Sequence, residues 1–295
     1  MGILFVVTDT KRKSLVFVVD TGEVLSLHKM AEAAKNRPFE GIYAVTGTSG
    51  TYIRSAPDKT TKNNIDFLSV TGPHLVAIAQ GHAKSTPAVG AYVERYLEFK
   101  GGPPYLKPVG SFRIPRIVVK KVFESHVPTI IKAAAEFNVN RYTLGAIIID
   151  EIARLDPFEP IYEKLSSGII GRNTSVGVAQ VTLETANHLI KAGVYHPHSK
   201  DTRLPIRSAI NNTDRKILYE YVVQPKYGIR FAAANLRFII DVWMPYVDLS
   251  KRPEILGTLY SKGSGTPNAH PESSERGKQI AGEFYKLAKL WLRAK

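Results

Sequence analysis

The sequence contains no cysteine among its 295 residues, which excludes a disulfide scaffold, a thiolate zinc site and a cysteine nucleophile. It also has no apolar run of about 18 residues, the length that a membrane-spanning helix needs. Acidic residues are scarce: 26 Asp and Glu stand against 40 Lys and Arg, which leaves a net charge of +14. This excess predicts a polyanionic partner such as nucleic acid, acidic lipid or an anionic cell-wall polymer.

The hydrophobic content is 44%, which is enough for a packed core, and the length fits one large domain or two ordinary ones. A boundary is expected at Gly101-Gly102-Pro103-Pro104, because this segment cannot continue a helix. Short segments rich in Val, Ile, Phe and Tyr precede it and predict strands. These expected strands are Ile3–Thr8, Ser14–Val19, Tyr43–Thr46 and Leu75–Ala79, with a turn at Gly47–Gly50, and they are followed by an expected helix over Ala88–Phe99.

Helical periodicity dominates after the boundary. The expected helices are Val127–Phe137, Thr143–Leu155, Thr182–Ala192, Arg215–Tyr221, Gly228–Trp243 and Glu275–Arg293. We therefore predict an α+β fold, with a small β-rich domain of unknown role over residues 1–110 and a mainly helical domain over residues 111–295. The helical part carries a net charge of +10 (27 basic and 17 acidic residues), against +4 for residues 1–110 (13 and 9).

The segment LGAIIIDEIARLD (144–156) is an apolar helix whose second half presents the adjacent carboxylates of Asp150 and Glu151. A helix that is apolar nearly all round is buried, so we expect these carboxylates to be partly desolvated. Desolvation raises the pKa of a carboxyl group, and a carboxylic acid held protonated near neutral pH is a general acid. Adjacent residues point about 100° apart on a helix, so only one of the two is expected to face a given cleft. The alternative is an ordinary surface or ion-paired residue near a helix end.

A second segment, SVGVAQVTLETANHL (175–189), places a Gly-x-x-Gln turn at Gly177–Gln180 before a new helix. Together with the Glu151 helix, this order resembles the lysozyme-like superfamily of goose-type lysozymes and soluble lytic transglycosylases. Their pattern is an apolar helix ending in a catalytic Glu, a Gly-Leu-Met-Gln turn and a helix beginning near Pro-x-Thr-Ala. Glu151 falls on the catalytic Glu of that pattern, and Thr185-Ala186 on its Thr-Ala.

A third match is ILGTLYSKG (255–263), which resembles the Ala-Tyr-Asn-Ala-Gly motif of the same superfamily and places Tyr260 on its tyrosine. The resemblance covers about residues 120 to 290 and implies a helical lysozyme-like domain. It further implies that Gln180, Tyr260, Ser175 and Ser261 line a sugar-binding cleft. No metal or organic cofactor is implied.

The chain departs from this pattern where the superfamily has further functional residues. Gly171 stands nine residues before Gln180, where many goose-type lysozymes have Asp and lytic transglycosylases have Ser. Thr182 stands where some lysozymes have a second Asp, and Ser261 replaces the Asn of the tyrosine motif. A second acid is therefore not obvious. Asp156, Glu159 and Glu163 lie in the loop after the Glu151 helix and are candidates, with Glu163 the first choice on spacing, although solvated loop charges are the simpler explanation of each.

The resemblance implies a muramidase or lytic transglycosylase that cuts the β-1,4 bond between N-acetylmuramic acid and N-acetylglucosamine, with Glu151 as the general acid. The partner would be the peptidoglycan glycan strand. Two alternatives stay open: an inactive lysozyme-like protein that binds carbohydrate or has a structural role, and a basic nucleic-acid-binding protein. The second lacks support from any helix-turn-helix, RNA-binding or zinc motif.

The apolar stretch at the N-terminus is followed, not preceded, by Lys11-Arg12-Lys13, so it is not typical of a signal peptide. We expect synthesis in a bacterial or phage-infected cytoplasm without a Sec-type signal. The protein would then reach the cell wall as an endolysin, or as an effector carried by a delivery or secretion machine and countered by an immunity or inhibitor protein.

Overall fold

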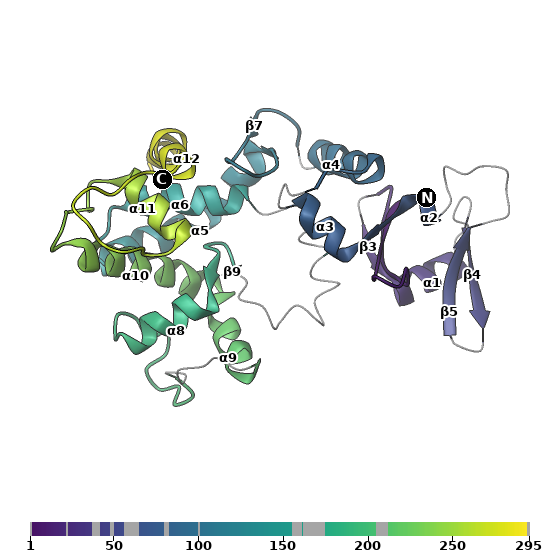
Figure 1. Ribbon diagram of the computed structural model, residues 1–295, viewed down its shortest axis with the longest axis horizontal. Helices are drawn as coiled ribbons and strands as arrows, with labels where there is room; N and C mark the ends of the chain where they lie inside the picture. The colour runs from purple at the N-terminus through teal and green to yellow at the C-terminus, as the bar shows by residue number, and fades with distance from the viewer. Residues whose placement is uncertain are drawn as a thin grey trace. The chain divides into compact units, whose positions relative to one another are not determined.

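A computed structural model of the chain describes residues 2–21, 23–36, 42–47, 50–55, 65–79, 83–99, 101–154, 161, 175–204 and 212–293. The fold is α+β, as predicted, and the chain divides into two compact units (Figure 1). Unit 1 holds the described residues up to Pro103 together with Gly110–Phe112 and Ile161. Unit 2 holds Pro104–Val109 and almost all described residues from Arg113 onward. No helix within the described ranges is long and apolar enough to cross a membrane.

Unit 1 is built on a four-stranded sheet with the strand order β3-β2-β1-β6. The pairs β1–β2 and β2–β3 are antiparallel, whereas β1–β6 is parallel. Strands β4 and β5 form a separate antiparallel hairpin in which Gly47 pairs with Gly50, as the turn prediction requires. The strands are β1 (Ile3–Thr8), β2 (Ser14–Val19), β3 (Val24–Ser26), β4 (Ile42–Gly47), β5 (Gly50–Ser55) and β6 (Ser69–Thr71).

Unit 1 also contains helices, so its description as simply β-rich is incomplete. These helices are α1 (Leu27–Asn36), α2 (Ile65–Leu68), α3 (Gly72–Ala79) and α4 (Pro87–Phe99). Helix α4 confirms the expected helix over Ala88–Phe99 and packs on β1, where the rings of Phe5 and Tyr92 meet edge to face at 5.3 Å.

The prediction of a strand over Leu75–Ala79 is wrong, because this segment lies inside α3. The hydroxyl of Thr71 accepts a bond from the backbone amide of His74 (3.4 Å), as the side chain of a helix N-cap does. A proline, Pro73, stands in the first turn, where its missing N–H costs nothing. A short apolar run alone does not distinguish a strand from a buried helix turn.

Unit 2 is mainly helical and has one continuous hydrophobic core. Its helices are α5 (Arg116–Glu136), α6 (Arg141–Ala153), α8 (Leu183–Lys191), α9 (Asn212–Val222), α10 (Pro225–Trp243), α11 (Pro253–Lys262), α12 (Glu275–Gln279) and α13 (Tyr285–Trp291). A π-helical turn, η2 (Ile280–Phe284), joins α12 to α13, so the single helix predicted over Glu275–Arg293 is divided. Two short antiparallel pairs complete the unit: β7 (Tyr105–Leu106) with β8 (Ile114–Pro115), and β9 (Ser175–Val176) with β10 (Val181–Thr182).

Helix α6 lies at the centre of this core and is buried from Thr143 to Ala153. The side chain of Asn140 caps its N-terminus by accepting bonds from the backbone amides of Tyr142 (2.8 Å) and Thr143 (3.2 Å). Gly145 allows close packing, because a Cβ there would lie 3.2 Å from side-chain atoms of Ala288 and Leu292. The C-terminal end of α6, which carries Asp150 and Glu151, is therefore fixed in the interior of the unit.

Candidate active site

The carboxylates of Asp150 and Glu151 lie at the buried end of α6. Asp150 is fully buried, and Glu151 is only 6% exposed. Burying a carboxylate without a partner is costly, so both side chains need compensating charges and hydrogen bonds.

Arg276 of α12 supplies that compensation to both residues at once. Its Nε donates to Asp150 Oδ2 at 2.7 Å, and its Nη2 donates to Glu151 Oε1 at 2.6 Å. Arg154, one turn after Asp150, donates from Nε to both Asp150 oxygens at 3.0 and 3.1 Å. Two guanidinium groups therefore balance two carboxylates. Although adjacent residues point in different directions on a helix, one guanidinium reaches both carboxylates.

Arg276 is held in place by close contact between α12 and α11. The side chain of Ser274 caps α12 by accepting from the amide of Gly277 (3.1 Å), and the amide of Ser274 donates to the Thr258 hydroxyl (2.9 Å). A Cβ at Gly277 would lie 2.1 Å from Thr258 Oγ1 and 2.2 Å from the Glu254 carbonyl oxygen. Only glycine fits beside Arg276, and this fit brings the guanidinium to the end of α6.

The predicted turn at Gly177–Gln180 connects β9 to β10. Gly177 and Gln180 both have a positive φ, +71° and +47°, and the amide of Gln180 donates to the Gly177 carbonyl at 3.0 Å. A Cβ at Gly177 would approach the Val222 carbonyl oxygen to 2.9 Å, so the turn needs glycine for its space as well as for its φ. The side-chain amide of Gln180 also donates to the Gly177 carbonyl (2.9 Å) and so braces the turn.

Tyr260 of α11 connects this turn to the carboxylate cluster. Its hydroxyl donates to the Ala179 carbonyl at 2.7 Å. Burial raises the pKa of Tyr260 well above its usual range, and the charge of Glu151 raises it further, which places the phenol in the electrostatic field of that carboxylate. Tyr260 thus contacts the Gly177–Gln180 turn and is within the electrostatic reach of Glu151, although these segments are far apart in the sequence.

The other predicted site residues are less informative. The hydroxyl of Ser261 donates to the Thr258 carbonyl (2.9 Å) within its own helix. Ser175 lies in β9, where its backbone pairs with Thr182. Asp156, Glu159, Glu163 and Gly171 lie outside the described residues. Within the part of the chain that the structure describes, no group of three His, Asp or Glu side chains is arranged to hold a metal ion.

The pKa of Glu151 is raised to about 7. Burial is the main cause; Arg276 opposes it, the neighbouring charge of Asp150 adds to it, and Arg154 opposes it more weakly. Glu151 is therefore a carboxyl group that both holds and releases a proton near neutral pH, which a general acid requires.

No known protein family matches the chain, and no curated protein matches it as a relative.

The two arginines that pair with Asp150 and Glu151, Arg154 and Arg276, were not predicted from the sequence. Arg154 leaves a visible signal, because Asp150 and Arg154 are spaced i, i+4 on a predicted helix and such residues face each other. Arg276 leaves none. It is 125 positions from Glu151, and its partners become apparent only when α12 is packed against α11.

Proposed function

We propose that this protein is a peptidoglycan glycosidase, a muramidase or lytic transglycosylase, in which Glu151 is the general acid. The observation that carries the proposal is the buried Glu151 carboxyl with its pKa near 7. Its charge acts on the Tyr260 phenol, whose hydroxyl donates to the Gly177–Gln180 turn. A proton donor of this kind is what cleavage of a glycosidic bond needs.

In the proposed reaction, Glu151 gives its proton to the glycosidic oxygen as the bond from that oxygen to the anomeric carbon breaks. The leaving sugar keeps the proton as a hydroxyl group. Water, or the 6-hydroxyl of the same muramic acid, then attacks the anomeric carbon and returns a proton to Glu151. Attack by water gives a reducing end, and attack by the hydroxyl gives a 1,6-anhydro end.

Arg276 suits this proton cycle because it holds two carboxylates. When Glu151 is protonated, the guanidinium still pairs with Asp150 through Nε and is not left as an uncompensated buried charge. When Glu151 is ionised, Nη2 pairs with it. Both protonation states of the acid are therefore accommodated without a rearrangement of α12.

The test is solubilisation of purified peptidoglycan by the wild type, by Glu151→Gln and by the control Glu272→Gln, with products identified by mass. Gln keeps the shape of Glu and removes the transferable proton, and a lost general acid typically costs about 10²–10⁴-fold in rate. Glu272 is exposed, and the structure records no ion pair for it among the described residues. We expect soluble muropeptides from the wild type and the control but not from Glu151→Gln.

The product masses separate the two chemistries, since anhydro ends lack one water relative to reducing ends. Equal release by Glu151→Gln and the wild type would remove the catalytic role of Glu151. If the wild type binds insoluble peptidoglycan from several wall types and releases nothing, the protein is a carbohydrate-binding protein. The ion pairs of Asp150 and Glu151 with Arg276 are then a structural cluster.

A further inference from the structure

A group of cations in unit 2 interacts with aromatic rings and not with carboxylates. Most arginines of this unit form ion pairs: Arg154, Arg203, Arg215, Arg230, Arg237, Arg252 and Arg276. By contrast, Arg116, Arg141 and Arg293 form no ion pair with any carboxylate among the described residues. No carboxylate of the described residues therefore neutralises these three side chains.

Tyr142 and Tyr285 organise part of this group. Their rings meet edge to face at 6.0 Å, and Lys289 lies over both, 5.9 and 4.9 Å from their centroids. Arg141 lies 4.8 Å over the Tyr142 ring and donates to its hydroxyl at 2.8 Å. Arg141, and less strongly Arg293, lowers the pKa of the Tyr142 phenol, as nearby cations do. Three cations thus surround one tyrosine.

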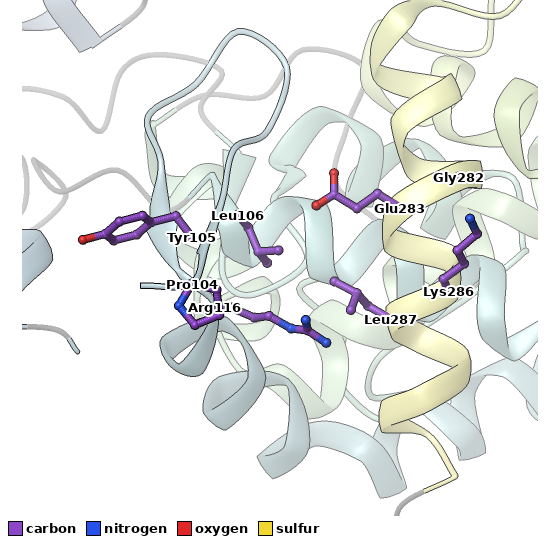
Figure 2. Close-up of a pocket in the computed structure, with 8 residues that line it drawn as sticks. All are labelled: Pro104, Tyr105, Leu106, Arg116, Gly282, Glu283, Lys286 and Leu287. Carbon is purple, nitrogen blue, oxygen red and sulfur yellow. The ribbon is translucent and has the colours of Figure 1, made fainter. Parts of the chain in front are cut away.

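The positive surface continues along α13. Lys286 and Lys289 are exposed and lie one turn apart on α13, and Arg293 is exposed in the turn that follows the helix, four residues after Lys289. Lys286 also borders a hollow of about 530 Å³ that is lined by residues of β7, η2 and α13, shown in Figure 2. Arg116 enters the same hollow from α5 and lies 5.8 Å over the ring of Trp291. Glu283, which accepts a bond from Gln279, is the one acid lining this hollow.

We propose that Arg141, Lys286, Lys289 and Arg293, which we call the α13 surface, bind a linear polyanion that carries phosphodiester groups and no bases, such as poly(glycerol phosphate). The guanidinium group of arginine donates two parallel hydrogen bonds to the oxygens of one phosphate. Exposed cations spaced along a surface can each bind one phosphate of a polymer that repeats its anionic group. Arg141 and Lys289 lie over the rings of Tyr142 and Tyr285, so a base that stacks on these sides of the rings would have to displace the cations.

The test measures binding of poly(glycerol phosphate) to the full-length protein by calorimetry at several salt concentrations. The variant Arg141→Gln/Lys289→Gln/Arg293→Gln is compared with Lys216→Gln/Lys251→Gln/Lys262→Gln, which removes the same charge from exposed residues elsewhere in unit 2. We expect the first variant to bind at least about tenfold more weakly near 0.1 M salt, with the slope of log K against log salt reduced by about 2. The control is expected to change affinity less than about threefold.

Equal losses of affinity in the two variants would overturn the proposal, because binding would then follow net charge alone.

Single-stranded DNA of the same charge and polyglutamate serve as competing probes. Equally tight binding of the DNA would assign the surface to nucleic acid, and equally tight binding of polyglutamate would remove the preference for phosphate. Thermal unfolding of each variant confirms that it is folded. This experiment measures binding and not cleavage, so its result tests the α13 surface independently of the proposed role of Glu151.

Discussion

Burial raises the pKa of the Glu151 carboxyl group and the Arg276 guanidinium lowers it, and the effect of burial is the larger one. A pKa near 7 in the folded protein exceeds the usual value of 4.5, so the folded state holds a proton that the unfolded state has already released between these pH values. This carboxyl therefore stabilises the fold least above about pH 7 and progressively more as the pH falls toward 4.5. Glutamine has nearly the same shape as glutamate but does not titrate, so Glu151→Gln removes this contribution to the pH dependence of stability.

We accordingly expect the difference in unfolding free energy between Glu151→Gln and the wild type to shift in favour of the variant as the pH rises. The shift amounts to about 3 kcal/mol between about pH 4 and pH 8, because the pKa rises from 4.5 to about 7 and each pKa unit is worth about 1.4 kcal/mol. Urea unfolding across this range measures it, with Glu272→Gln as the control. Parallel pH profiles for Glu151→Gln and the wild type would show that the carboxyl titrates normally.

Arg276 is expected to be coupled energetically to Glu151. Arg276→Gln leaves two buried carboxylates with Arg154 alone, so it should destabilise the protein by about 3–5 kcal/mol. In the Glu151→Gln background the same substitution should cost about 1–3 kcal/mol less, since one buried charge is already gone. A double-mutant cycle of unfolding free energies measures this difference. Additive effects within about 0.5 kcal/mol would contradict the bridging role.

At the scale of elements, the approach of α12 to α11 decides where Arg276 lies. A Cβ at Gly277 would sit 2.1 Å from Thr258 Oγ1, whereas a Cβ at Gly282, in the following π turn, would meet nothing within 4 Å. Gly277→Ala should therefore cost about 2–3 kcal/mol and reduce any activity that depends on Glu151. Gly282→Ala is the matched control and is expected to change stability by less than about 1 kcal/mol. Equal unfolding free energies of the two variants would show that α12 can move away from α11 without loss of stability.

The elements also show what the sequence was able to predict. Strands β1 and β2 match their predicted bounds, because alternating or continuous runs of Val, Ile and Phe between turns have few other solutions. Helix α6 (Arg141–Ala153) lies close to its predicted range, Thr143–Leu155, because its apolar residues recur at helical spacing. Helix α3 was not predictable, since five apolar residues fit both periods. The convergence of Glu151, Tyr260 and Arg276 depends on packing between distant segments, which periodicity does not encode.

At the scale of the whole molecule, the two units have separate hydrophobic clusters. Phe17 belongs to the cluster of unit 1, whereas both tryptophans, Trp243 and Trp291, belong to that of unit 2. Phe17→Ala should destabilise unit 1 by about 3–5 kcal/mol. We expect its thermal transition to shift when followed by far-UV circular dichroism, with little change in the transition followed by tryptophan fluorescence. Equal shifts in both signals would indicate that the two units unfold as one.

The π turn Ile280–Phe284 has a consequence for how the C-terminal segment tolerates change in length. Gly277 before the turn and Ile280 at its start pack against α11; after the turn, Ala288 and Trp291 pack against α6 and α5. A π turn accommodates one more residue than an α-helical turn. It therefore determines how the residues that follow the turn are rotated about the helix axis relative to those that precede it. Deletion of one residue here would rotate one half by about 100° relative to the other. Homologous chains should therefore accept substitutions at this position far more readily than insertions or deletions.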